Sequence, residues 1–468
     1  MTKDKKKETK KSGRTLYLDL SFLGALVYFL FRIPITNIIG NEGNGYFAFS
    51  WELYTVLGLL FGHCLMYAVS DMVRKRVRRN QYQNSRRVLT KALLLGVVLS
   101  ALGCAVCYFG SDILLGVISM KLSGISLRML GIMLVFSTLS GVFCGYFEGS
   151  GTKIPTSFSK IIEGFIAGTG ALVFTSGLSE YGTKVGELLY NKQYKPAFGA
   201  AGIVAGCICG SIFALLFLVV INQMYQVSLK QLIKKEGARE TETAGSVFKE
   251  MLKLFLITFT ELVFFNVFRI INMWLYIRAT LPTDMKDRIV QYLGAYHGKF
   301  LVITSVAILV VLMFTGRNVP RICRSYQKNN LVQCWRYFGE DIKQMIALSL
   351  PFAILLAVLA KNMYSVIYKS SGNIEVTMLQ IGSVNIILIT FAVYMYRILR
   401  KLDMTVFLIL IPLVALVVQT VVMYFVVQLP DMGALSLVIS EVAFWFLVAA
   451  MEFLLCVKAL KHGFKRKI

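Results

Sequence analysis

Long apolar runs alternate with short polar breaks along the chain, and this pattern constrains the fold more than any other feature. Of 468 residues, 56% are hydrophobic and only 16% are charged. A bilayer core about 30 Å thick needs about 20 apolar residues per spanning helix. We therefore predict an all-α polytopic membrane protein with about twelve transmembrane helices. The expected spans are 15–39, 47–72, 90–110, 126–147, 161–180, 199–224, 250–278, 293–315, 345–368, 376–397, 404–428 and 433–457.

The breaks between these runs differ in charge. Lys and Arg total 50 against 25 Asp and Glu, and the basic residues gather in alternate breaks. The basic breaks are the N-terminus, 74–87, 225–249, 316–330, 397–401 and the C-terminal tail, whereas breaks such as 41–45 and 370–373 are short and nearly neutral or mixed. Since basic loops stay in the cytoplasm, twelve spans place both termini there. The first apolar run is too long for a secretory signal, so we expect an uncleaved span in the cell membrane.

The spans divide into two halves of six. We expect a basic cytoplasmic tail (1–14), an N-lobe (15–224), a cytoplasmic linker (225–249), a C-lobe (250–457) and a second basic tail (458–468). The sequence YFLFRI at 28–33 matches FNVFRI at 265–270, at corresponding places in the first and seventh spans. Such parallel repeats predict two pseudo-symmetric lobes related by an axis along the membrane normal.

Two arginines sit inside spans, one in each half. Arg32 lies about 7 Å from the middle of the first span, and Arg269 lies at nearly the same depth in the seventh. An arginine facing lipid there costs at least about 2.5 kcal/mol, so both should face protein or a hydrated cavity. Two guanidinium groups around one cavity suit a phosphate or pyrophosphate.

A structural ion pair is the alternative role for each arginine. Glu52 enters the second span at a depth comparable to that of Arg32, and Glu261 shares a helix with Arg269. Residues eight apart are separated by about 12 Å along a helix, so Glu261 and Arg269 cannot pair directly. We count both glutamates as candidate site residues. Glu441 either supports an arginine or takes up a proton, and the sequence leaves this open.

Proline and glycine mark two further candidate positions for gating or structural roles. Pro34 follows Arg32 closely and is expected to kink or end the first helix near its preceding turn. The sequence GYFEGSGTKIP at 145–155 joins the fourth and fifth spans. Its Gly145, Gly149 and Gly151 permit a tight turn, and Pro155 restricts entry to the next helix.

Other classes of site are not indicated. The nine cysteines fall mostly within apolar runs and the three histidines are scattered singly, so we expect no metal site and no cofactor. No phosphate-binding loop of the Gly-x-x-x-x-Gly-Lys type occurs, which argues against ATP hydrolysis. No soluble region is long enough for a nucleic-acid-binding domain.

Three segments carry a resemblance to a known family. FRIPITNIIGNEGNGYFAFSWELY (31–54), AVSDMVRKR (68–76) with YQNSRRV (82–88), and GYFEGSGTKIPTSFSKIIEG (145–164) resemble the stage V sporulation protein B and polysaccharide-transporter branch of the multidrug/oligosaccharidyl-lipid/polysaccharide (MOP) flippase superfamily. The resemblance is clear over the first 170 residues and extends by layout over the rest. It departs from the branch in one respect, because many members carry fourteen spans.

The resemblance implies a V-shaped, MATE-like pair of lobes that opens alternately to each side. It also implies a non-enzymatic flippase for a lipid-linked oligosaccharide or cell-wall precursor of the undecaprenyl-pyrophosphate type. Arg32 matches by motif an arginine that holds the pyrophosphate in relatives, whereas Arg269 is assigned through the internal repeat alone. Membrane lipids and glycosyltransferases or a polymerase of the same pathway are the expected partners. Coupling to H⁺ or Na⁺ stays open.

Three other functions remain as alternatives. A cation-coupled multidrug exporter of the same superfamily would require an acidic residue in the middle of the first span, where Phe29 and Leu30 stand instead. A membrane glycosyltransferase or polymerase would require an acidic pair in a sizeable outer loop. A lipid scramblase or a structural partner of a synthase complex is the third alternative.

Overall fold

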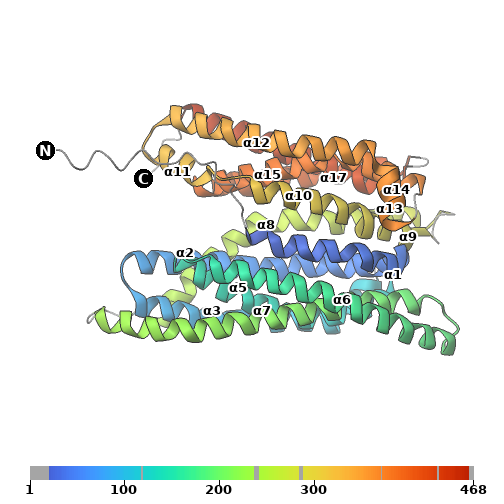
Figure 1. The fold of residues 1–468 in the computed structure, drawn as a ribbon, viewed down its shortest axis with the longest axis horizontal. Coiled ribbons are helices and arrows are strands. Elements are labelled where there is room, and N and C mark those ends of the chain that lie inside the picture. The colour runs from blue at the N-terminus through green and yellow to red at the C-terminus, as the bar shows by residue number, and fades with distance from the viewer. Residues whose placement is uncertain are drawn as a thin grey trace.

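The computed structural model describes residues 20–116, 120–236, 242–283, 288–369, 372–429 and 432–462, and every regular element within these ranges is a helix (Figure 1). The first half contains η1 (Leu20–Phe22), α1 (Leu23–Tyr54), η2 (Thr55–Leu59), α2 (Leu60–Arg78), α3 (Tyr82–Phe109), α4 (Ser111–Gly116), η3 (Lys121–Ser123), α5 (Gly124–Gly149), α6 (Ile154–Leu188) and α7 (Tyr194–Lys235). The second half contains α8 (Ala244–Thr280), α9 (Ile289–Ala295), η5 (Tyr296–Phe300), α10 (Leu301–Phe314), α11 (Val319–Gln327), α12 (Leu331–Val358), α13 (Ala360–Tyr368), α14 (Asn373–Gly382), α15 (Asn385–Lys401), α16 (Thr405–Val426) and α17 (Ser436–His462).

Twelve crossings follow from these helices. Eleven helical stretches among the described residues are long and apolar enough to span a membrane, and the first of them runs from Leu23 to Arg78. That stretch turns back on itself at Gly40, whose φ of 65° and ψ of −169° are not helical. Arg32 bonds Asn44 and the ring of Tyr28 stacks on that of Trp51, contacts that a straight helix would place far out of reach. The predicted all-α, multi-pass fold of about twelve helices is therefore confirmed.

The first hairpin corrects two details of the sequence analysis. Residues 41–45, expected as a loop, are helical, and the turn is made by Gly40 alone. The helix also continues through Pro34, so the break expected there falls six residues later. Gly40 can adopt a positive φ that a proline cannot, and glycine takes that conformation without steric cost.

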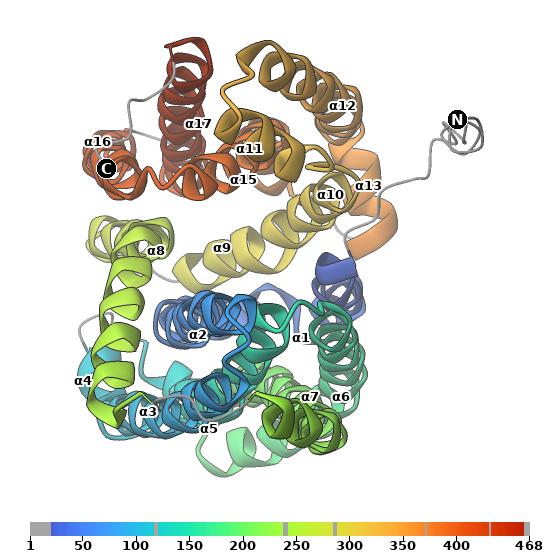
Figure 2. The ribbon, with the colours of Figure 1, turned by 90° about the vertical axis from the view of Figure 1, so that its left-hand side faces the viewer.

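The helices form two bundles with the chain crossing once between them (Figures 1 and 2). Helices α1 to α7 make one bundle, and α10 to α17 make the other. Helix α8 packs on α2, and α9 and α10 pack along α1, so these helices form the seam between the halves. We call the end of the molecule near the Gly40 turn the Gly40 end, and the opposite end, where α15 finishes, the Arg400 end.

The boundary between the halves is largely helical. Helix α7 continues to Lys235, beyond the expected end of the N-lobe at 224, and α8 begins at Ala244. Residues 1–19 and 463–468 contain most of the two basic tails and lie outside the described residues.

Glycines allow the helices of the first bundle to touch backbone to backbone. Gly202, Gly206 and Gly210 recur every four residues on α7, and a Cβ on any of them would overlap atoms of α6. In a bilayer, where lipid tails are as apolar as leucine, such close packing supplies much of the attraction between helices. Close packing of the two backbones, more than contacts between large apolar side chains, therefore holds α6 against α7.

The glycine motif that follows α5 has two separate structural roles. Gly145 and Gly149 lie within α5, where an added Cβ would overlap the backbone of α2 at Met66 and Ser70. Gly151 has a φ of 99° and makes the turn toward α6, and Pro155 stands in the first turn of α6. The first two glycines serve helix packing, and the last two residues shape the connection.

We expect Gly206→Val to destabilise the protein by about 1–3 kcal/mol, because the added methyl groups force α6 and α7 apart. Gly177→Val is the matched control, since a Cβ at this α6 glycine meets no atom within 4 Å. Thermal unfolding of the purified protein in detergent measures both variants. Equal midpoints for the two would contradict the packing argument.

Candidate functional site

Arg32 is held on α1 by groups that leave part of its guanidinium unused. The side chain is only 2% exposed. Its Nη2 donates to Asn44 Oδ1 at 2.7 Å, and its Cζ lies 4.6 Å from the centre of the Phe47 ring. Its Nη1 is buried and has no hydrogen-bond partner. Because a buried charged donor without an acceptor is costly, this nitrogen is suited to an incoming anion.

Arg269 approaches from α8, in the other half of the chain. Its Nη2 lies 2.7 Å from Glu441 Oε1 on α17, and its Nη1 lies 4.0 Å from Glu52 Oε1 on α1. Tyr296 donates from its hydroxyl to the other oxygen of Glu441 at 2.7 Å. Glu441, whose role the sequence left open, therefore supports Arg269 directly.

Glu52 joins the two halves through a second contact. Its Oε1 lies 3.3 Å from Nε2 of His297 in η5, and both side chains are buried. The other ring nitrogen of His297 has no partner. His297 is not among the residues predicted from the sequence, because scattered single histidines indicate no metal site. The available signal was that an ionisable residue inside an apolar span is a functional candidate by default.

Both arginines border one cavity between the halves, of about 50 Å³. Its walls come from α1, α8, η5 and α10, with Glu52, Phe47 and His297 between the two arginines. A cavity of this size has room for only a few water molecules. A larger guest requires the halves to separate.

The charges around this cavity nearly balance. Arg269 is paired with Glu441 and lies close to Glu52, while Glu52 also contacts His297. Arg32 makes no ion pair with a carboxylate among the described residues. The arrangement can therefore accept an anion at Arg32 first, and at Arg269 by displacing Glu52.

The remaining predicted site residue lies elsewhere. Glu261, on α8, lies 3.3 Å from Arg400 Nη1 and accepts a hydrogen bond from the Tyr396 hydroxyl at 3.4 Å. Arg400 in turn lies 4.1 Å from the ring centre of Tyr67 on α2, so this cluster ties the halves together toward the Arg400 end. Glu261 is not brought to the cavity with Arg32, Arg269 and Glu52.

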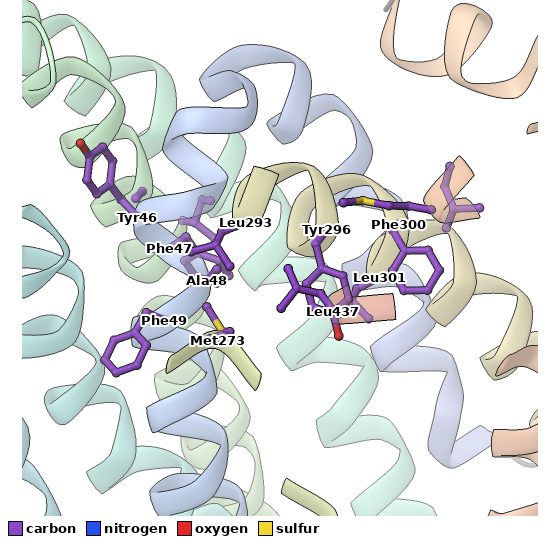
Figure 3. Close-up of a cluster of buried hydrophobic side chains, with 14 of the residues drawn as sticks. Tyr46, Phe47, Ala48, Phe49, Met273, Leu293, Tyr296, Phe300, Leu301 and Leu437 are labelled. Carbon is purple, nitrogen blue, oxygen red and sulfur yellow. The ribbon is translucent and has the colours of Figure 1, made fainter. Parts of the chain in front are cut away.

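The seam at the Gly40 end is tightly packed. Figure 3 shows side chains of the second segment of α1 beside those of α9, η5 and α10; the labelled residues are Tyr46, Phe47, Ala48, Phe49, Met273, Leu293, Tyr296, Phe300, Leu301 and Leu437. The backbones also meet there, because a Cβ on Gly294 would overlap Asn41 and one on Gly298 would overlap the Asn44 side chain. Asn44 thus bonds Arg32 and is pressed against the closing helix.

A polar contact reinforces this seam. Glu375 on α14 accepts from Asn41 Nδ2 of α1 at 2.7 Å and lies 2.7 Å from Lys299 Nζ of η5. Thr36 of α1 also donates to the carbonyl of Gly298 at 3.1 Å. The Gly40 end is closed in this structure by interlocked backbones and buried polar bonds.

Comparison with known proteins gives one curated relative and a set of structural neighbours. No protein-family model matches the chain. The chain is 20% identical to Stage V sporulation protein B of Bacillus subtilis (strain 168) over 470 residues, which cover 98% of this chain and 86% of that protein. The resemblance to this branch of the MOP superfamily, drawn from the first 170 residues, is confirmed and extends over nearly the whole length.

The structural neighbours are transporters. An inward-facing multidrug resistance MATE family transporter of the MOP superfamily superimposes with a TM-score of 0.73 at 14% identity, over 96% of this chain and 97% of that one. An outward-facing MATE family transporter of the same superfamily superimposes with a TM-score of 0.61 at 13% identity, over 97% of this chain and 99% of that one. A MOP superfamily transporter from Pyrococcus furiosus superimposes with a TM-score of 0.54 at 13% identity, over 95% of this chain and 96% of that one. For that transporter, reverse polarity of the binding pocket suggests a different function. The fold is MATE-like, as expected.

We expect Glu441→Leu to destabilise the protein by about 3 kcal/mol, because it leaves the Arg269 guanidinium in the seam without its closest counterion. Adding Arg269→Met to this variant should recover most of the loss, since neither charge then remains. Thermal unfolding of the two variants tests this. A double variant less stable than Glu441→Leu alone would contradict the pairing.

We expect Gly298→Val to separate the halves at the Gly40 end, because the added side chain takes the place of Asn44. Spin labels at the exposed Tyr190 and Val366 report the separation by pulsed electron paramagnetic resonance. Gly339→Val is the control, since a Cβ there meets nothing within 4 Å. The distance should lengthen for Gly298→Val alone. An unchanged distance, or the same change in both variants, would contradict the account of the seam.

Proposed function

We propose that this protein is a membrane transporter of the MOP superfamily type that moves a lipid-linked oligosaccharide or cell-wall precursor across the cell membrane by alternating access. The MATE-like fold and the full-length similarity to Stage V sporulation protein B support the transporter class. The substrate class rests on the chemistry of the central cavity. A transporter role, rather than an enzymatic one, agrees with the fold that the chain shares with the MATE transporters.

The observation that carries the substrate class is the unpartnered Nη1 of Arg32. The carboxylates at the cavity are engaged by Arg269, His297 and Tyr296, so an organic cation would have to break an existing contact to bind. An anion can accept a hydrogen bond from Arg32 Nη1 without breaking an existing contact. A planar guanidinium matches the paired oxygens of a pyrophosphate. This favours a pyrophosphate-linked lipid over the cationic drugs of a multidrug exporter.

A second, larger cavity of about 210 Å³ lies in the first bundle and supports a route to the arginine cavity. It shares Tyr28, Phe29 and Trp51 with the arginine cavity and extends to Lys160 and Glu163, near the start of α6. We infer that substrate enters from the Arg400 end while the Gly40 end is closed. The higher TM-score with the inward-facing MATE structure than with the outward-facing one agrees with this direction.

We further propose that the Arg400 end faces the cytoplasm. The basic break 397–401 lies at this end of the molecule, and the start of the described chain at η1 and the end of α17 pack beside it, which agrees with the positive-inside rule. The Gly40 end then faces outward, and opening it would release the lipid headgroup to the outer leaflet. Pathway glycosyltransferases or a polymerase are the proposed partners on either side.

We expect Arg32→Met to slow translocation of a fluorescent polyprenyl-pyrophosphate sugar in proteoliposomes by about 10–100-fold. The loss corresponds to one charged hydrogen bond, worth about 1.5–3 kcal/mol. Arg269→Met should also slow it. Arg128→Met is the control, because Arg128 forms a surface pair with Asp112 and does not line the cavity.

Two results would overturn this proposal. One is an unchanged translocation rate in both arginine variants. The other is transport of organic cations by the wild-type protein together with no movement of the lipid-linked sugar, which would favour the exporter alternative.

A further inference from the structure

The larger cavity in the first bundle carries side chains that an anion site does not need. It has a volume of about 210 Å³ and is lined by residues of α1, α5, α6 and α7. Tyr28, Phe29 and Trp51 border both this cavity and the arginine cavity, so the two cavities are direct neighbours. We call the larger one the aromatic cavity.

The first hairpin places the aromatic cavity one helical turn from Arg32. Tyr28 and Arg32 are four residues apart, so they lie on one face of α1 and about 6 Å apart along its axis. The turn at Gly40 brings Trp51 back against Tyr28, with their ring centres 6.1 Å apart. A group bonded directly to a phosphate at Arg32 would therefore meet these two rings.

Aromatic neighbours fix the orientation of Trp51. Its ring centre lies 5.2 Å from that of Phe47 and 5.4 Å from that of Tyr54. Tyr28 and Trp51 are only partly buried, and both line the cavity. The face of an aromatic ring is negative and attracts the C–H groups of a ring laid over it. The cavity thus presents a fixed surface for stacking.

An ion pair lines the same cavity from α6. Lys160 Nζ lies 2.6 Å from Glu163 Oε2, and Ser211 of α7 donates to the other carboxylate oxygen at 3.3 Å. Close packing of α6 on α1 holds the pair in place, because a Cβ on Gly24 would overlap the carbonyl of Lys160. The pair supplies hydrogen-bond donors and acceptors without adding net charge.

This combination favours a neutral guest that carries many hydroxyl groups. An organic cation could stack on the rings, but Lys160 already neutralises Glu163, the carboxylate that lines the cavity. An acyl chain would remove water from the ion pair and return no hydrogen bond. A sugar ring makes both kinds of contact, since its C–H faces pack on aromatic rings and its hydroxyl groups donate and accept.

We propose that the aromatic cavity binds the first sugar of the lipid-linked substrate, a neutral sugar whose ring stacks on Tyr28 and Trp51. Lys160 and Glu163 bond its hydroxyl groups. The inference rests on the proposed function, because the sugar reaches this cavity when its pyrophosphate is bound at Arg32. At about 210 Å³ the cavity suits one ring, so the sugar bonded directly to the pyrophosphate is the one recognised.

The two parts of the headgroup are then held by different parts of the protein. The residues that line the aromatic cavity all belong to the first half, so this site moves with one bundle. The arginine cavity takes Arg32 from the first half and Arg269 from the second. The sugar is therefore selected within the first bundle, and the pyrophosphate engages both.

The test compares two probes that differ by one sugar, farnesyl pyrophosphate and farnesyl-pyrophosphoryl-glucose. Isothermal titration calorimetry of the full-length protein in detergent measures both affinities, and their ratio cancels effects on the pyrophosphate and the tail. The wild-type protein should bind the glucose probe about tenfold more tightly. Trp51→Leu should bring the ratio close to one, because it removes the stacking face, whereas Trp51→Phe should keep most of the preference.

Two further variants complete the design. Lys160→Met combined with Glu163→Gln removes both charges together and should also lower the ratio. Trp274→Leu is the matched control, since Trp274 lies on α8 and lines neither cavity, and it should leave the ratio unchanged.

The possible failures are distinguishable. Equal affinity of the wild type for the two probes would overturn the sugar site and leave the anion site standing. A preference that survives both Trp51→Leu and the paired charge variant would do the same. Failure of the wild type to bind either probe would overturn the proposed function, and the sugar site with it.

Discussion

The energetic cost of placing charge inside a membrane is the constraint on which this structure depends. An arginine or glutamate in hydrocarbon must find a partner or water. Arg32 bonds Asn44 on its own helix, and Arg269 pairs with Glu441 within the second half. Glu52 of the first half is the group that crosses the seam, because it lies 4.0 Å from Arg269 and 3.3 Å from His297 of the second half. Moving the bundles therefore changes the electrostatic energy of the site through Glu52. The same constraint that protects the charges from lipid thus couples them to the conformation.

Close packing at glycines also favours two states of the seam, one closed and one open. The α9 backbone meets that of α1 at Gly294, and Gly298 of η5 lies against the Asn44 side chain, so there is no room for a gradual sliding of α1 past α9 and η5. Close-packed interfaces have few intermediate arrangements, so small changes at a site are converted into discrete shifts of whole bundles. In the first bundle, the Gly202, Gly206 and Gly210 series makes α6 and α7 one rigid unit. Rigid bundles with a two-state seam are what alternating access requires.

Much of this could be predicted from the sequence because hydropathy and charge are local properties. The number of spans and the all-helical class follow from run lengths. The equal depth of Arg32 and Arg269 follows from an internal repeat, but the sequence did not say whether the two arginines face one cavity. The turn at Gly40 was misplaced because glycine occurs at three positions in 40–45, and the pattern does not say which one turns and which ones pack. The partners of the arginines could not be predicted, since Glu441 lies 172 residues from Arg269 and only tertiary packing brings them together.

The central claim is that Arg32 keeps a donor free for the phosphate of a lipid headgroup. The direct measurement is an experimental density map of the protein with a polyprenyl pyrophosphate bound. The account predicts phosphate oxygens at about 2.7–2.9 Å from the Arg32 guanidinium, with Glu52 moved away from Arg269. A map in which the phosphates lie elsewhere, with Arg32 bonded only to Asn44 and Arg269 still held by both glutamates, would contradict it.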